Sequence, residues 1–129
     1  MDFLQPPGWV QPRGYTNGIA ARGRTVCVSG MIGWDAQAVF QHDDLVGQIR
    51  QALDNVVQVL AEADARPEHI VRMTWYVVDK HEYIAAYKQV GEAYRELIGK
   101  HYPAMTAVQV AALIEDRAKV EIEVTAMLP

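Results

Sequence analysis

The sequence predicts a two-layer α+β fold, in which two helices pack on one face of a β-sheet. Apolar residues recur at spacings of three and four between positions 45 and 60, which is typical of an amphipathic helix. Residues 69–78 are rich in β-branched and aromatic side chains, and residues 119–127 alternate between apolar and polar types. Both patterns indicate strands. Helices and strands that follow one another in this way bury their apolar sides against each other as layers.

The first part of the chain is expected to hold an irregular arm and two short strands. Residues 1–14 are rich in proline and glycine, which favour turns over regular structure. Strand-like runs follow at 16–21 and 25–29, and Gly23 between them suits the tight turn of a β-hairpin. Residues 30–41 are then expected to form a loop.

The first helix and the strand after it follow from the apolar pattern. The helix is expected to begin at Asp43 or Asp44, either of which suits the N-cap, and to end near Ala63. Its apolar face consists of Leu45, Ile49, Leu53, Val56, Val57 and Leu60. The strand at 69–78 carries largely apolar side chains on both faces, so we expect it to lie in the centre of the sheet.

A second helix and two final strands complete the expected fold. Asp79 and Glu82 have the spacing of a capping box, and Gly99 is a natural end for the helix that Asp79 begins. Strands are expected at 106–113 and at 119–127. The order of elements is therefore β-β-α-β-α-β-β, without internal repeats or linkers.

Length and charge limit the classes of protein to which the chain can belong. With 129 residues it suits one domain, residues 1–129. The net charge of −4 argues against a protein that follows the nucleic-acid backbone, because such proteins present a basic face. The longest uncharged apolar stretch, 104–114, is too short to span a membrane, and the acidic start, which breaks at Pro6, is unlike a secretory signal. We therefore expect a cytoplasmic protein that binds neither membrane nor nucleic acid.

One face of the expected sheet has no helix to cover it. That face must contact solvent or another subunit. The side chains that the central strand would present there include Tyr76, whose size favours burial in an interface. The sequence therefore predicts an oligomer.

The sequence lacks the motifs that are typical of several kinds of active site. The four histidines lie far apart and follow no metal-binding spacing: His42, His69, His81 and His101. Ser29 lies outside any G-x-S-x-G elbow, and no Walker or G-x-G-x-x-G loop is present, so we expect no metal and no cofactor. Cys27 is the only cysteine, which excludes an intramolecular disulfide, and its apolar neighbours predict a small buried side chain rather than a nucleophile.

The residues left to carry chemistry lie at strand ends and in loops: Tyr15, Ser29, Gly30, Trp34, Met105, Thr106 and Glu121. Each also has a purely structural interpretation. Tyr15 could be an interface aromatic residue, Met105 could fill the core, and Glu121 could lie on the solvent side of an edge strand. Residue types alone do not choose between these interpretations.

The chain resembles the RidA/YjgF family of small enamine/imine deaminases from about residue 13 to residue 128. The similar segments are Gly14–Gly18, Val28–Gly33, Gln51–Val56, Val71–Asp79, Pro103–Val110 and Val120–Ala126. The resemblance implies a chorismate-mutase-like α+β protomer in which the last two of these segments form a C-terminal hairpin. It also implies a homotrimer with three ligand clefts between its subunits.

The resemblance further implies a set of site residues. Glu121 matches the glutamate that orients the hydrolytic water and is the expected catalytic residue, whereas Tyr15 matches the tyrosine that lines the cleft. Met105 stands where deaminating members have an arginine that binds the substrate carboxylate. Met31 and Ala107 replace a glutamine and a cysteine that are common in the family, which makes the cleft more apolar. The expected substrate-binding residues are Tyr15, Ser29, Gly30, Met31, Met105, Thr106 and Ala107.

These residues lead to one main hypothesis and two alternatives. The main hypothesis is a protein that binds a small, partly apolar metabolite and acts as an atypical enamine/imine deaminase, weak or inactive on standard 2-imino acids because position 105 has no cation. Arg13, Arg72 or Lys88 could replace that cation. The first alternative is a ligand-binding or interaction protein without catalysis. The second, the ribonuclease or translation-inhibiting activity ascribed to some members, is disfavoured by the acidic balance and the absence of a histidine pair.

Overall fold

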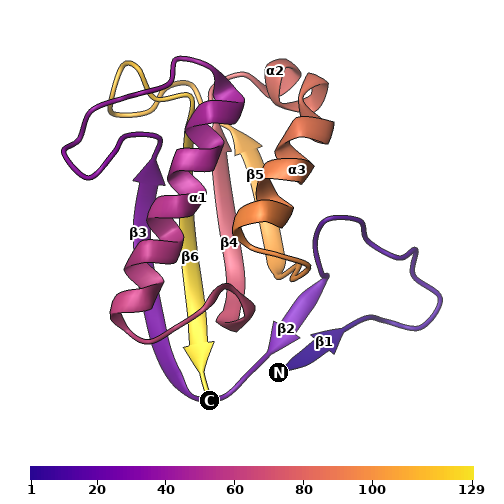
Figure 1. Cartoon of the computed structure of the whole chain (residues 1–129). Coiled ribbons are helices and arrows are strands. Elements are labelled where there is room, and N and C mark those ends of the chain that lie inside the picture. Colours follow the sequence, from indigo (N-terminus) through magenta and orange to yellow (C-terminus); the bar gives the residue numbers. More distant parts are fainter.

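The computed structural model describes residues 1–129 and consists of two sheets and three α-helices (Figure 1). The main sheet has four strands, in the spatial order β3 (Arg24–Ile32), β6 (Val120–Leu128), β4 (Ile70–Val77) and β5 (Ala104–Gln109). Figure 1 shows that the helices lie on one side of this sheet: α1 (Leu45–Glu62), α2 (Lys80–Ala85) and α3 (Tyr87–Leu97). The two-layer α+β prediction is confirmed. None of these helices is long and apolar enough to cross a membrane.

The core lies between α1 and the sheet. The side chains on the inner face of α1 are buried at the predicted spacing: Leu45, Ile49, Leu53, Val56 and Leu60. Alternate residues of β4 and β6 are buried opposite them: Met73, Trp75, Val77, Val120, Ile122 and Val124. Complete burial of one large apolar side chain contributes about 1.5–3 kcal/mol relative to exposure. The apolar periodicity of these segments therefore explains the two layers.

The start of α1 and the position of β4 agree with the prediction. Oδ2 of Asp44 accepts a hydrogen bond from the backbone N–H of Gly47 at 2.8 Å, which makes Asp44 the N-cap. Asp43 instead forms an ion pair with Arg117. A 3-10 turn at Pro67–His69 leads into β4, which lies between β6 and β5 as expected of a central strand.

The last two strands do not form the expected hairpin. β4 pairs in parallel with β5 and antiparallel with β6. A parallel neighbour requires a crossover, which α2 and α3 supply. The chain then crosses the end of β4, where the N–H of Val110 donates to the carbonyl of Val77 at 2.9 Å, and returns as β6 between β3 and β4. β5 therefore ends at Gln109, earlier than predicted, and is an edge strand.

The N-terminal region also differs from the prediction. The segment expected to be irregular contains β1 (Asp2–Leu4), which pairs antiparallel with β2 (Gly18–Ala20). The hairpin expected around Gly23 is wrong, because β3 pairs with β6 rather than with β2. Glycine is needed at position 23 for another reason: its φ is +139°, and a Cβ there would lie 1.7 Å from the carbonyl oxygen of Leu128. Residues 5–17 extend from the body as a long loop (Figure 1).

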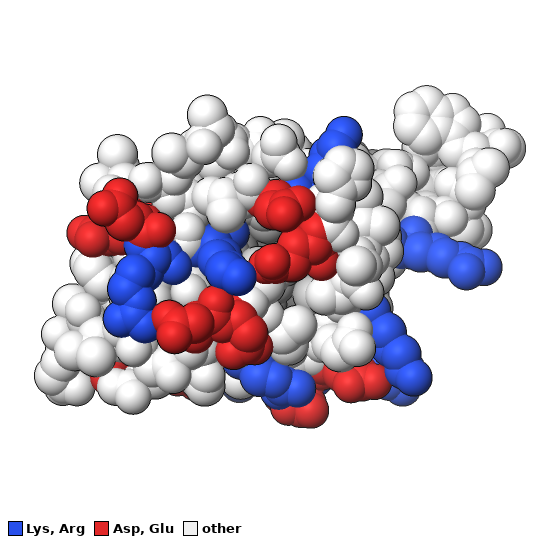
Figure 2. Space-filling model, turned by 90° about the horizontal axis from the view of Figure 1, so that it is seen from above, with Lys and Arg blue, Asp and Glu red and all other residues white.

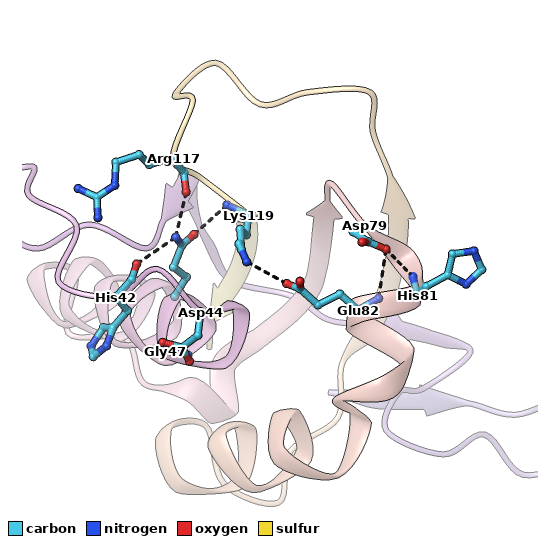
Figure 3. Close-up of polar contacts among 9 residues, drawn as sticks. His42, Asp44, Gly47, Asp79, His81, Glu82, Arg117 and Lys119 are labelled. Carbon is cyan, nitrogen blue, oxygen red and sulfur yellow. Dashed lines mark hydrogen bonds and ion pairs between the residues drawn. The ribbon is translucent and has the colours of Figure 1, made fainter.

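The second predicted helix is two helices, separated at Ala86. Asp79 caps α2 as expected, since its Oδ1 accepts from the backbone N–H groups of His81 and Glu82 at 3.0 and 3.1 Å (Figure 3). The reciprocal half of the capping box is absent. The carboxylate of Glu82 instead forms an ion pair with Lys119 at 3.4 Å, which joins α2 to the segment before β6.

Cys27 is exposed, contrary to the prediction of a buried side chain. Val28, its neighbour in β3, is buried toward the helices, so Cys27 points to the opposite side of the sheet, where it pairs with Thr125 of β6. We call this side, which no helix covers, the open face. The exposure of Cys27 is therefore set by the alternation of side chains along the strand and not by the apolar composition of the segment.

Gln48 is the buried polar side chain of the core and joins α1 to two loops (Figure 3). Its Nε2 donates to the carbonyls of His42 at 3.1 Å and Arg117 at 2.9 Å. Its Oε1 accepts from the backbone N–H of Lys119 at 2.8 Å. One amide thus satisfies three backbone groups that would otherwise have no partner at the end of the sheet.

Replacement of Gln48 by Leu should lower the free energy of unfolding by about 2–5 kcal/mol, because three backbone groups lose the hydrogen bonds that they form with this buried amide. Gln58→Leu is the matched control, since Gln58 lies in the same helix, is exposed and bonds only to Asp54. We expect the control to change stability by about 0.5 kcal/mol or less. Urea denaturation at one fixed protein concentration measures both. Equal midpoints for the two variants would show that the Gln48 bonds do not stabilise the fold.

Candidate functional site

A cleft of about 710 Å³ lies beside the edge strand β5. Three parts of the chain line it. The N-terminal loop contributes Arg13, Gly14 and Tyr15, and β5 contributes Met105 and Ala107. The rest of the lining comes from Trp75 of β4 and from the segment between α2 and the start of β5.

The N-terminal loop reaches the cleft because it is fixed to the start of β5. The backbone N–H of Thr16 donates to the carbonyl of Pro103 at 3.0 Å, and Thr16 forms a parallel bridge with Ala104. This contact holds Tyr15, which is 42% exposed, against the cleft that Met105 also lines.

Met105 and Ala107 face the helix layer. In the parallel register Met105 pairs with Met73 and Ala107 pairs with Trp75, and both partners are buried under the helices. Because β5 is the edge strand, the helices cover this side of it only in part, and Ala107 remains exposed. The cleft is the space that the helix layer leaves open beside β5.

Five aromatic side chains line the cleft, and we call them the aromatic wall: Trp75, Tyr83, Tyr87, Tyr94 and Tyr102. Tyr83 and Tyr87 meet edge to face with ring centroids 5.2 Å apart, and Tyr94 and Tyr102 stack at 5.5 Å. The ring of Trp75 lies 6.2 Å from that of Tyr83 and 6.5 Å from that of Tyr94. These are the separations at which aromatic side chains attract one another.

The phenols of the aromatic wall carry no charge near neutral pH where they are buried. Burial, with a smaller contribution from the neighbouring Tyr87, raises the pKa of Tyr83 to about 12. Burial also raises the pKa of Tyr94, whose hydroxyl donates to the carbonyl of His101 at 2.5 Å. Trp75 differs from these tyrosines, because its Nε1 is buried without a hydrogen-bond partner.

Arg13 and Arg95 are the charged residues of the cleft, and no acidic side chain lines it. Both are exposed, and neither takes part in an ion pair. Of the cations proposed from the sequence, only Arg13 lies here: Arg72 is an exposed residue of the open face, and Lys88 of α3 does not line the cleft.

The aromatic wall and Arg95 were missed in the sequence analysis. The apolar spacing of residues 83–98 assigns this segment to the core, and a tyrosine at such a position is normally a core residue. The sequence feature that could have revealed the aromatic wall is the density of tyrosines in this segment. A phenol is amphipathic and often lies where apolar and polar surfaces meet.

The other predicted site residues do not line the cleft: Ser29, Gly30, Met31, Thr106 and Glu121. Thr106 alternates with Met105 and Ala107 and pairs with Thr74 on the open face. Glu121 lies between the buried residues Val120 and Ile122, so it too points to the open face. The predicted site residues are therefore divided between two sides of the sheet.

The carboxylate of Glu121 lies directly over Gly30. A Cβ at Gly30 would lie 2.2 Å from Oε2 of Glu121, so any other residue at position 30 would force the Glu121 side chain to move. The register of β3 shifts between Val28 and Met31, which places Ser29 and Gly30 in a bulge. Bulges often direct side chains at functional sites.

Polar groups occupy the open face beside Glu121. The hydroxyl of Tyr76 donates to Oε1 of Glu123 at 2.5 Å. This bond, together with desolvation and the neighbouring carboxylates, raises the pKa of Tyr76. The open face thus has hydrogen-bonded polar groups on β4 and β6, whereas the cleft is aromatic and cationic.

The rest of the surface has no cluster of metal-binding side chains. The face seen from above has no continuous basic track. No three histidine, cysteine or acidic side chains lie close enough together to hold a metal ion. Figure 2 shows basic and acidic side chains interspersed over this face. The chain therefore supplies two groups of residues that could act on a ligand. One is an apolar cleft with two arginines, and the other, on the open face of the sheet, is a carboxylate over a glycine.

Comparisons with known proteins agree with this fold. A family model described as Endoribonuclease L-PSP matches residues 10–128. The 2-iminobutanoate/2-iminopropanoate deaminase of Capra hircus is 31% identical over 105 residues, which cover 81% of this chain and 73% of that protein.

Solved structures extend the comparison to almost the whole chain. The Rid-family protein YyfB from Yersinia pestis has a TM-score of 0.87 at 28% identity, with 98% of both chains covered. Escherichia coli TdcF, solved with bound serine, has a TM-score of 0.70 at 30% identity, with 95% of this chain and 93% of that chain covered. The chain therefore belongs to the RidA/YjgF family and has its chorismate-mutase-like α+β fold.

Proposed function

We propose that this chain binds a small, partly apolar metabolite in clefts between the subunits of a homotrimer and hydrolyses enamines or imines there. Activity on the standard 2-imino acids is weak or absent in this proposal. Family membership supports it, as does the goat relative that is named as a 2-iminobutanoate/2-iminopropanoate deaminase.

The division of the site residues between two faces is the observation that carries this proposal. Tyr15 and Met105 line the cleft, whereas Glu121 lies on the open face over Gly30. A second subunit that packs against the first can bring its Glu121 to the cleft. The same contact would cover the open face. A closed ring of three subunits gives each cleft one carboxylate from its neighbour.

One carboxylate is sufficient for the proton transfers of imine hydrolysis. The water oxygen bonds to the carbon of the C=N group while Glu121 accepts a proton from that water. The protonated carboxyl group donates this proton to the nitrogen, which gives a carbinolamine. The carboxylate then takes the hydroxyl proton of the carbinolamine and passes it to the amino group as the C–N bond breaks, so that ammonia and a carbonyl product leave and the carboxylate is regenerated. An enamine enters the same path after it takes a proton on carbon and becomes an imine.

Met105 is the reason to expect low activity on small 2-imino acids. A thioether has no charge and no strong hydrogen-bond donor, so it cannot bind a substrate carboxylate as a guanidinium does. A hydrogen bond to a charged group contributes about 1.5–3 kcal/mol. A substrate with few other contacts therefore loses much of its binding energy here.

Ligand binding without turnover is the second candidate function. It is favoured by the cleft of the single chain, which has no acidic side chain to activate water. Binding requires only the cleft, whereas turnover also requires Glu121 of another subunit. We do not propose ribonuclease activity, because the net charge of −4 is unfavourable for binding a phosphate backbone and basic and acidic side chains are interspersed on the face that Figure 2 shows.

The purified protein should be a trimer of about 43 kDa, three times the 14.4 kDa of one chain. The open face then lies in the subunit interface, where Tyr76 is buried. Multi-angle light scattering at micromolar concentration measures the mass directly. A stable monomer under these conditions would contradict both the trimer and the cleft between subunits.

Met105→Arg should raise the hydrolysis of 2-iminobutanoate and 2-iminopropanoate by about tenfold to hundredfold over the unmodified protein. The physical reason is the new charge-assisted contact to the substrate carboxylate, since about 1.4 kcal/mol corresponds to a factor of ten in rate. The imino acids are generated in situ, and the release of 2-oxo acid is followed with time.

Glu121→Gln in the Met105→Arg background should then remove most of the gained activity, because the amide cannot accept the proton of water. Glu123→Gln is the matched control: Glu123 lies on the same strand and face and bonds to Tyr76. Light scattering must show the same assembly for both variants. Full activity of the Glu121→Gln variant would exclude the role that we assign to Glu121.

A further inference from the structure

We propose that the cleft selects ligands that combine an aromatic ring with a carboxylate, with Arg13 and Arg95 binding the carboxylate and the aromatic wall contacting the ring. The nature of the ligand as an imino acid rests on the proposed function. The aromatic ring and the negative charge of the ligand are inferred from the lining of the cleft alone.

The size of the cleft favours a ligand larger than a short-chain imino acid. Pockets of roughly 300–1,000 Å³ enclose ligands of drug-like size. The cleft, at about 710 Å³, lies well within that range. A ligand of three or four carbons would leave most of it filled with water, so its apolar lining would contribute little binding energy.

The lining favours a ring. Tyr15 and Tyr87 are 42% and 57% exposed although both belong to a concave surface, which is where ligand-contacting aromatic residues are found. Tyr83 and Tyr87 already meet edge to face, and a planar ligand placed beside them gains stacked or edge contacts of the same kind. Met105 and Ala107 add apolar side chains from β5.

The charges of the cleft favour an anion. Arg13 and Arg95 come from different parts of the chain, line the same cleft and have no acidic partner. A guanidinium with free donors binds a carboxylate through two parallel hydrogen bonds. The buried phenols of Tyr83 and Tyr94 stay neutral because burial raises the pKa of each, so they do not repel an anion.

The aromatic wall contains an unpaired donor. Trp75 is 1% exposed, and its Nε1 has no acceptor within the chain. A buried donor without a partner destabilises the protein. The imine nitrogen or carbonyl oxygen of a 2-imino or 2-oxo acid is an acceptor that would pair with it once the neighbouring rings admit the ligand.

The test measures binding rather than turnover. Phenylpyruvate is a stable analogue of an aromatic 2-imino acid, in which oxygen replaces the imine nitrogen. Isothermal titration of the full-length protein compares it with pyruvate, which lacks the ring, and with phenylacetone, which lacks the carboxylate. We expect phenylpyruvate to bind at least about tenfold more tightly than either probe.

Variants test the residues. Arg13→Gln and Arg95→Gln should each weaken phenylpyruvate binding by about five- to twentyfold, whereas Lys88→Gln, an exposed cation of the same helix as Arg95, should not change it. Tyr87→Ala should weaken phenylpyruvate binding and leave pyruvate binding unchanged. Ile84→Ala is its control, because Ile84 is 49% exposed and does not line the cleft.

The outcomes separate this inference from the proposed function. Phenylpyruvate binding that depends on Arg13 and Arg95 supports the inference even if no imine is hydrolysed, and in that case only the proposed hydrolysis fails. Equal affinity for pyruvate and phenylpyruvate overturns the inference, even if small imino acids are hydrolysed. Arginine variants that bind phenylpyruvate like Lys88→Gln, with unchanged circular dichroism, also overturn it.

Discussion

The parallel pairing of β5 with β4 is the constraint on which the rest of the site depends. A parallel partner needs a crossover, and α2 and α3 provide it on the same side of the sheet as α1. β6 then fills the position on the other side of β4, so β5 keeps one free edge. The cleft forms at this edge because the crossover helices do not cover β5 completely. An antiparallel pair of β5 and β6 would leave no such space between strand and helix.

Strand alternation separates the acid from the cleft. The side-chain period of a strand is two, so Met105 and Glu121 stay on opposite faces whatever small adjustments the sheet makes. The carboxylate lies in the space that Gly30 leaves in the bulge of β3. A reaction that needs both groups therefore requires Glu121 of a second subunit, as in the trimer that we propose.

The sequence predicted the elements that follow from local patterns and missed those that depend on long-range pairing. The apolar spacing identified α1, Asp79 caps its helix as predicted, and of the two candidates Asp43 and Asp44 the structure selects Asp44. Pairing partners are set by the whole chain, so the hairpins expected around Gly23 and between the last two strands were wrong. Cys27 was misplaced because an apolar segment does not show which face each side chain takes. Of the expected site residues, Tyr15, Met105 and Ala107 line one cleft, whereas Arg95, which lines it too, could not be distinguished from an ordinary surface residue of a helix.

The residue at position 105 and the N-terminal loop together determine where positive charge lies in the cleft. A cation in the middle of β5 would face the aromatic wall, whereas methionine makes that side apolar and leaves the positive charge to Arg13 and Arg95. Arg13 lies in a loop that is attached to the start of β5 by the hydrogen bond from Thr16 to Pro103. The pairing of β1 with β2 holds the two ends of this loop together. If Arg13 binds the ligand as we propose, the ligand also contacts this loop, and part of its binding energy holds the loop in place. Under this proposal ligand affinity and the position of the N-terminal loop are linked, so each stabilises the other.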